Sequence, residues 1–174
     1  MILHANLVDI KDRKIYPVFV SVEDGKIVNI SQTDKPCSTY ILPGFIDAHV
    51  HIESSMLTPY EFSRLALKHG TIATISDPHE IANVLGIQGI EFMMNSASKT
   101  PFKFYFGAPS CVPATTFETS GAILDTQSVE KLLKQKNIYC LSEMMNFPEV
   151  LFKDEDVLSK IKSAQNNNKP IDAH

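Results

Sequence analysis

The sequence predicts an α/β fold, a partial (β/α)8 TIM barrel of about five strand–helix units that follows a small β-rich segment. From residue 43 onward, five short apolar segments typical of strands alternate with four segments of helical periodicity. Such alternation is typical of a parallel sheet joined by right-handed crossovers. The spacing of the units also fits an open doubly wound sheet, so a second observation is needed to choose between the two architectures.

The second observation is where the metal-binding residue types occur along the chain. They fall at or near the ends of several predicted strands, where the active sites of both architectures lie. Several strands that direct ligands toward one point favour the barrel. A closed barrel needs about 250 residues, and only about 130 follow the β-rich segment, so we expect an incomplete barrel. The residues are His49, His51, Asp77, Glu143 and His174.

Residues 1–42 predict β-structure. A first strand covers residues 2–10, alternating valines mark a second at 18–22, and a third follows at 26–30. Asp24-Gly25 between the last two strands is a hairpin signal. Three short strands bury little apolar surface by themselves, so we expect another sheet or domain to cover them.

The segment 43–55 predicts a buried strand that also carries half of a metal site. Alternate side chains of a strand share a face, so one face carries apolar residues and the other carries Asp47, His49 and His51. Two histidines at this spacing can reach one cation at about 2.0–2.2 Å. Asp47 could accept the other ring N–H of a ligand and fix its tautomer. The alternative is a strand whose two histidines are merely hydrogen-bonded.

The remaining elements alternate in order. Thr58-Pro59 predicts a capped helix start and Gly70 its end. Asp77 and Glu80 fit the same capping pattern before a second helix, in which Gly86 and Gly89 indicate close packing. The further strands are predicted at residues 71–76, 102–106, 138–141 and 169–174, and the further helices around 81–92, 129–133 and 157–161.

Composition narrows the function classes. The chain has 174 residues and a net charge of −4 without a run of Lys or Arg, so neither nucleic acid nor an anionic membrane is expected as a partner. The three cysteines form no C-x-x-C pair, which favours a reducing cytoplasm over a disulfide framework. The start of the sequence lacks the pattern of a signal peptide and the sequence has no apolar run of about 20 residues, so neither a signal peptide nor a membrane span is expected. We therefore expect a soluble cytoplasmic protein.

His49 and His51 need further ligands to complete a metal site. Glu143 follows a short apolar strand and could place a carboxylate between two cations, and His174 could supply a third imidazole. Imidazole and carboxylate ligands suit zinc, manganese or iron. Such a site lowers the pKa of bound water and favours hydrolysis of a C–N bond. The alternatives are a surface carboxylate at Glu143, a frayed terminus at His174 and a purely capping role for Asp77 and Glu80.

The segment Pro-Gly-Phe-Ile-Asp-Ala-His-Val-His resembles the first barrel strand of the amidohydrolase superfamily of metal-dependent hydrolases. Further blocks narrow the resemblance to the adenine deaminase branch, from about residue 22 to the end of the chain. These blocks are residues 52–59, Gly70-Thr71, residues 77–84 with Gly86, residues 108–115, Ser120-Gly121-Ala122 and Glu143-Met144-Met145-Asn146.

The resemblance implies hydrolytic deamination of adenine, as in purine salvage, with a divalent pair that is usually Mn²⁺ or Fe²⁺, and with Zn²⁺ as a third option. It implies that His49 and His51 bind one metal, that Glu143 bridges the pair and that His174 binds the second metal. It also implies catalytic roles near the base for Glu143, Asp77 and Glu80, and a substrate pocket that includes His79 and Ser110. Residues 1–42 would be part of the family's small β-sandwich, and residues 43–174 the first part of its barrel.

The family continues beyond the fifth strand with a further histidine ligand, a late aspartate and the rest of the sandwich. Hydrolysis needs a positioned proton acceptor as well as the metal, so this chain alone is expected to be inactive. Its open sheet edge would favour association, so a homo-oligomer is expected. Two alternatives stay open: a dihydroorotase-like or hydantoinase-like amidohydrolase, which Glu143 in place of a bridging lysine disfavours, and a non-catalytic metal-binding or oligomerising module.

Overall fold

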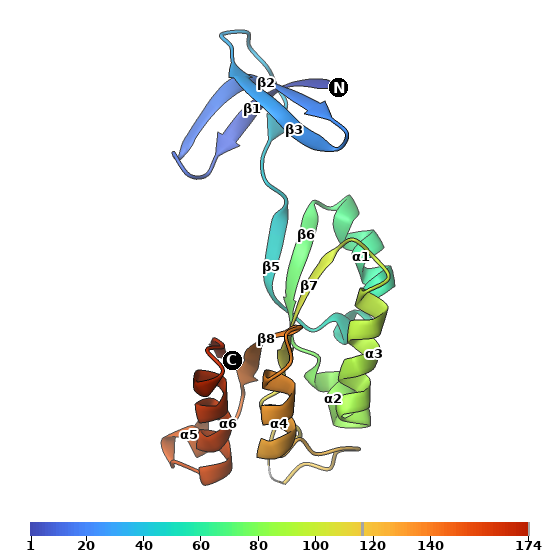
Figure 1. The fold of residues 1–174 in the computed structure, drawn as a ribbon, viewed down its shortest axis with the longest axis vertical. Coiled ribbons are helices and arrows are strands. Elements are labelled where there is room, and N and C mark those ends of the chain that lie inside the picture. Colours follow the sequence, from blue (N-terminus) through green and yellow to red (C-terminus); the bar gives the residue numbers. More distant parts are fainter. Residues whose placement is uncertain (116, 174) are drawn as a thin grey trace. The chain divides into compact units, whose positions relative to one another are not determined.

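Figure 1 shows the computed structural model of the chain, which describes residues 1–115 and 117–173. The chain forms two compact units, Met1–Gly44 and Phe45–His174. Each unit has its own sheet. Among the described residues, no helix is both long and apolar enough to cross a membrane.

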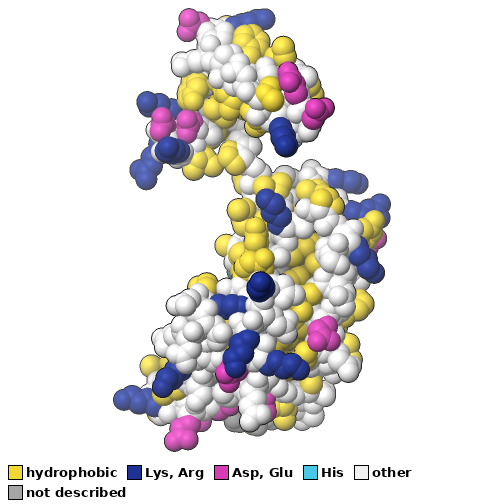
Figure 2. All heavy atoms as spheres, viewed as in Figure 1, with side chains coloured by type: hydrophobic (Ala, Val, Ile, Leu, Met, Phe, Trp, Pro, Cys, Tyr) yellow, Lys and Arg dark blue, Asp and Glu magenta, His cyan; other side chains and the backbone are white. Residues whose placement is uncertain are grey.

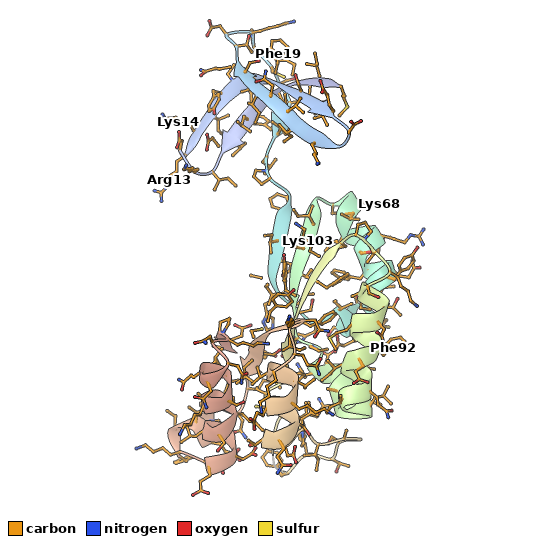
Figure 3. All side chains as sticks on the ribbon, in the orientation of Figure 1. Arg13, Lys14, Phe19, Lys68, Phe92 and Lys103 are labelled. Atoms are coloured by element: carbon orange, nitrogen blue, oxygen red, sulfur yellow. The ribbon has the colours of Figure 1, made fainter. Side chains whose placement is uncertain are left out.

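The first unit is a four-stranded sheet in the order β3-β2-β1-β4. Its strands are β1 (Ile2–Asp9), β2 (Lys14–Glu23), β3 (Lys26–Gln32) and the short β4 (Tyr40–Ile41). The three predicted strands and the hairpin at Asp24-Gly25 are confirmed, since both turn residues have positive φ. Alternate residues of β2, Val18 and Val20, are buried, while Phe19 on the other face (labelled in Figure 3) stacks on the ring of His4.

The second unit confirms the predicted α/β class. Five parallel strands run in the order β5-β6-β7-β8-β9, and they form a curled sheet that corresponds to about half of a barrel. The strands are β5 (Phe45–Val50), β6 (Thr71–Ser76), β7 (Lys103–Ala108), β8 (Ile138–Met144) and β9 (Ile171–Ala173). The helices are η1 (Ile52–Ser55), α1 (Pro59–Lys68), α2 (His79–Leu85), α3 (Ile87–Ala97), α4 (Thr126–Leu133), α5 (Phe147–Leu151) and α6 (Glu155–Asn166).

The core of this unit lies between the sheet and its helices. Ile90 of α3 and Leu132 of α4 are fully buried there, together with Phe106 and Leu141 of the central strands β7 and β8. The apolar positions that the helical periodicity marked in α4, Val129, Leu132 and Leu133, are all buried. Of those marked in α6, Val157 is buried, whereas Ile161 is half-buried and Leu158 is 37% exposed. The sequence therefore identifies the buried face of α4 fully and that of α6 only in part.

The expectation that the His-x-His strand is buried is wrong. β5 is an edge strand of the sheet, and Phe45 and Ile46 are 57% and 61% exposed. Hydrophobic side chains gather on the surface around this strand in Figure 2. Ile52, which the alternation assigned to the strand, lies instead in η1, where it is fully buried. An edge strand lacks a neighbour on one side, and for this reason its apolar residues stay exposed.

The second predicted helix is divided into α2 and α3 at Gly86. This glycine has φ +61°, in a region that other residues rarely adopt. The division turns part of the predicted apolar pattern toward solvent, since Val84, Leu85 and Phe92 are 62%, 51% and 51% exposed. Phe92, labelled in Figure 3, points from α3 away from the sheet.

Gly89→Ala is expected to destabilise the chain although alanine favours helices over glycine by about 1 kcal/mol. A Cβ at Gly89 would lie 2.8 Å from the carbonyl oxygen of Ile81 and 3.0 Å from its Cγ1. Backbone in α2 cannot move aside without separating the two helices, and overpacking costs about 1–3 kcal/mol. Urea unfolding measures the change in the free energy of unfolding.

Asn95→Ala is the matched control, because Asn95 lies on the exposed side of the same helix. Alanine gains helix propensity there without meeting a neighbour, so the free energy of unfolding should stay unchanged or rise slightly. An increase in stability from Gly89→Ala would contradict the close packing of α2 against α3.

Candidate metal centre

Residues from three separate strands meet at the carboxyl ends of the second sheet. His49 lies near the end of β5 and His51 directly after it, Asp77 follows β6, and Glu143 lies near the end of β8. Parallel strands place their carboxyl ends at one edge. The chain segments that carry these residues are therefore brought together by the sheet topology, although they are far apart in sequence.

The distances define a compact cluster. His51 Nε2 lies 3.0 Å from His49 Nε2 and 3.2 Å from Glu143 Oε1. Glu143 Oε2 lies 3.5 Å from His49 Nε2, so the carboxylate faces both imidazoles. His79 Nδ1 lies 3.3 Å from Asp77 Oδ2 and 3.8 Å from Glu143 Oε1.

This cluster fits a divalent metal. One ligand atom each from His51, Asp77, His79 and Glu143 lies within 4.8 Å of all the others, and His49 adjoins this group through His51. Asp77 Oδ1 is buried and has no hydrogen-bond partner among the described residues. A buried carboxylate oxygen without a partner is costly, and a cation would satisfy it. Imidazole and carboxylate donors suit zinc, manganese or iron.

Electrostatics in the cluster favour positive charge. The hydrogen bond that His49 donates to Asp172 raises the pKa of His49, and the nearby charge of Glu143 adds to this effect. Burial opposes the charged form of His79, but the hydrogen bond and charge of Asp77 outweigh it, so the pKa of His79 is raised. Both shifts have the same origin, namely carboxylates that converge on one place.

Two further glutamates, Glu53 and Glu80, lie beside the cluster. Burial raises the pKa of Glu53, whose Oε1 accepts the backbone N–H of Ile81 at 3.1 Å. Glu80 accepts hydrogen bonds from the hydroxyl of Ser54, 2.7 Å from each carboxylate oxygen. The 3-10 helix η1 is thus tied to the start of α2, and Glu53 is a residue that sequence reasoning missed.

The predicted site residues are distributed unevenly over this arrangement. His49, His51, Asp77, His79 and Glu143 lie in the cluster, whereas Glu80 lies beside it, bonded to Ser54. Ser110 is buried and its hydroxyl donates to the backbone carbonyl of Glu143. His174, the predicted ligand of a second metal, lies outside the described residues.

Two local predictions around the cluster are wrong. Neither Asp77 nor Glu80 caps α2, since the residue at the N-cap is Pro78 and no side chain bonds there. The carboxylate of Asp77 contacts His79, and that of Glu80 accepts from Ser54. Asp47 does not hold a histidine ring either, because its Oδ1 accepts the backbone N–H of His49 at 3.2 Å. The ring of His49 instead meets Asp172 of β9, whose Oδ2 lies 2.8 Å from Nδ1.

Asp172 is the second residue that sequence reasoning missed, and a signal for it exists. Residues 47–49 and 172–174 both have the sequence Asp-Ala-His, and the Asp-Ala of each lies in a strand, β5 and β9. The repetition marks Asp172 as a polar residue of the same edge of the sheet. It does not reveal that Asp172 contacts the histidine of the other segment.

Comparison with known proteins agrees with this arrangement of strands and side chains. Residues 40–174 match the amidohydrolase family. The chain belongs to this family. Its members use divalent metals, in agreement with the side chains that converge at the carboxyl ends of β5, β6 and β8.

This amidohydrolase is similar to proteins named adenine deaminase. It is 60% identical over 174 residues to the adenine deaminase of Sulfurovum sp. (strain NBC37-1) and covers 33% of that protein. It is 55% identical to the adenine deaminase of Borreliella afzelii (strain PKo), with 99% of this chain and 32% of that protein covered. The chain thus spans about a third of the length of these relatives.

A solved structure supports the fold. The chain is similar, with a TM-score of 0.51, to 5-methylcytosine deaminase from Klebsiella pneumoniae liganded with 5-fluorocytosine. The match covers 100% of this chain and 51% of the other, at 12% sequence identity. At this identity the likeness concerns the course of the backbone, and it supports the fold alone.

Proposed function

We propose that this amidohydrolase contributes the metal-binding part of an enzyme that hydrolyses adenine to hypoxanthine and ammonia. One observation carries the proposal: His49, His51 and Glu143 converge beside a buried Asp77 oxygen that has no hydrogen-bond partner in the described part of the chain. The similarity to adenine deaminases supports the choice of adenine as substrate. Mn²⁺ and Fe²⁺ are the preferred metals of the proposal, with Zn²⁺ as the third.

The reaction replaces an amino group by oxygen. A water oxygen bonds to C6 of adenine, the bond from C6 to the exocyclic nitrogen breaks, and the amino group leaves as ammonia with one hydrogen from the water. The other hydrogen of the water stays on ring nitrogen N1 of hypoxanthine, whose C6 then carries a carbonyl oxygen. A bound metal pair would supply the nucleophile by lowering the pKa of water. The protein must hold the metals, orient the purine and move protons between oxygen and nitrogen.

The described residues can be assigned to these tasks. His49 and His51 would hold one metal, and Glu143, whose carboxylate faces both imidazoles, would supply a carboxylate to the metal pair. Asp77 Oδ2 accepts the Nδ1–H of His79, which fixes that proton and leaves Nε2 of His79 for the purine. Glu80, held by Ser54, lies close to the same region. We propose His174 as a ligand of the second metal and Ser110 as a support of Glu143.

A chimaeric enzyme tests the proposal. Residues 1–174 replace the matching third of the Sulfurovum relative, to which they are 60% identical. With Mn²⁺ present, the chimaera should release ammonia from adenine and form hypoxanthine, whereas the 174-residue chain alone should not. Ammonia and hypoxanthine are quantified together, because their release in equal amounts identifies hydrolytic deamination.

The unmodified Sulfurovum enzyme serves as the reference for metal content and for folding. A folded, metal-loaded chimaera that opens a cyclic amide such as dihydroorotate but leaves adenine intact would reject adenine as substrate. A folded chimaera that retains metal and turns over neither compound would favour a non-catalytic role. We also propose that the enzyme is cytoplasmic and forms homo-oligomers, which cell fractionation and light scattering can test.

A further inference from the structure

We propose that Asp172 is a positioning residue that fixes the tautomer of His49 and thereby prepares the centre for a cation. The inference rests on the metal-binding role in the proposed function. It concerns a residue of β9 that is neither a predicted ligand nor part of the predicted pocket. The geometry of both imidazole rings carries the argument.

The contact of His49 with Asp172 determines where the ring proton lies. His49 Nδ1 is 2.8 Å from Asp172 Oδ2, and an ionised carboxylate can only accept a hydrogen bond. Nδ1 therefore carries the proton, and in the neutral ring Nε2 is left with its lone pair. This nitrogen faces His51 Nε2 at 3.0 Å and Glu143 Oε2 at 3.5 Å.

His51 is oriented in the same way by a different partner. Its Nδ1 lies 3.0 Å from the backbone carbonyl oxygen of Asp77, which also can only accept. Its Nε2 lone pair consequently points at the Nε2 of His49. Two lone pairs and a carboxylate that converge without a cation repel one another, so both orienting contacts prepare the centre to bind one.

The contact between Asp172 and His49 joins the two edge strands of the sheet. β5 and β9 are the two edge strands of the five-stranded sheet, and His49 and Asp172 are 123 residues apart. Their contact therefore links the first and the last strand across the curled sheet. A shift of β9 would be transmitted directly to the ring of His49.

Because His49 and Asp172 are partly exposed, an effect of Asp172 on the histidine ring can be distinguished from an effect on the stability of the fold. The side chains of His49 and Asp172 are 36% and 39% exposed. Exposed charge pairs contribute little to the free energy of unfolding. Loss of Asp172 should therefore change the histidine tautomer and the metal affinity while leaving the folding of the chain nearly unaffected.

Asp47 provides the matched control. It also lies close to His49, but its carboxylate bonds to the backbone N–H and not to the ring. If any nearby negative charge sufficed, Asp47→Ala and Asp172→Ala would have similar effects. If the contact with the ring matters, only the change at Asp172 should alter the tautomer.

The experiment uses the metal-free 174-residue chain labelled with ¹⁵N-histidine, and His49→Gln identifies the signals of His49. At alkaline pH, where the imidazoles are neutral, ¹⁵N shifts should show His49 protonated at Nδ1 in the parent chain and in Asp47→Ala. In Asp172→Ala the Nε2–H form should appear. Asp172→Asn should retain the Nδ1–H form, because the amide oxygen can still accept.

Mn²⁺ titration of the same variants provides the second measurement. Loss of a residue that orients a metal ligand typically costs about 10–100-fold in affinity, so we expect a decrease of this size for Asp172→Ala, a smaller one for Asp172→Asn and almost none for Asp47→Ala. Circular dichroism confirms that each variant is folded. An unchanged His49 tautomer in folded Asp172→Ala, or an equal loss of affinity in Asp47→Ala, would overturn the inference.

Neither measurement contains adenine. If the chimaera binds metal but fails to deaminate adenine while the tautomer shifts as expected, the proposed substrate is rejected and the role of Asp172 stands. If adenine is deaminated and the tautomer is unchanged, the role of Asp172 is rejected and the proposed function stands.

Discussion

Glu143→Gln is expected to reduce the affinity of the chain for Mn²⁺ by more than about 100-fold, since residues that merely orient ligands already contribute 10–100-fold. Glu143 is 5% exposed and directs one carboxylate oxygen at His51 and the other at His49. Glutamine preserves the size of the side chain but removes its negative charge and one of its two acceptor oxygens. Both properties are needed to hold divalent cations beside two neutral imidazoles.

Metal content after gel filtration and a Mn²⁺ titration measure this effect in the 174-residue chain. The same substitution in the chimaera should abolish ammonia release from adenine. Glu149→Gln is the matched control: Glu149 lies in α5 and bonds to Asn146, away from the imidazoles. Equal metal binding by Glu143→Gln and the parent chain would exclude Glu143 from the centre.

Leu132→Ala is expected to lower the free energy of unfolding by about 2–5 kcal/mol, the usual cost of removing a large buried aliphatic side chain. Leu132 lies in α4, is fully buried and belongs to the core between the helices and the sheet. Alanine favours the helix at least as well as leucine, so the loss would come from packing and from the cavity that remains.

Urea unfolding followed by circular dichroism provides the measurement, with Leu151→Ala as the control. Leu151 lies in α5 and is 73% exposed, so the same truncation there removes little buried surface and should change the free energy of unfolding by less than about 0.5 kcal/mol. Similar losses at both positions would contradict a core centred on α4 and the neighbouring strands.

Most of the secondary structure could be predicted from local patterns. The predicted strand at residues 71–76 coincides with β6, and the apolar spacing of α4 identifies its buried face. The pattern failed where the environment of an element decides burial. β5 has the composition of a buried strand yet lies at an edge, and Gly86 divides a helix whose apolar residues then face solvent.

The candidate centre was predictable in its residue types and less so in its contacts. His49 and His51 are two residues apart, so the geometry of a strand places them on the same face. The apolar segment before Glu143 predicts a strand, and Glu143 falls at its end. The capping pattern of Asp77 and Glu80 could not show that Asp77 would turn toward His79. Asp47 and Asp172 occur in identical local sequences, so sequence could not decide which carboxylate would meet the ring of His49.

The sequence by itself determined the alternation of strands and helices, the family, and the imidazole and carboxylate groups available at the strand ends. Periodicity and residue chemistry are local properties and are therefore visible in a linear chain. Only the tertiary structure decided that Asp172 reaches His49, that β5 is exposed, and that one buried oxygen of Asp77 has no partner among residues 1–115 and 117–173. These depend on how the sheet curls and on which strands become its edges, because curvature and strand order bring together residues that are more than a hundred positions apart.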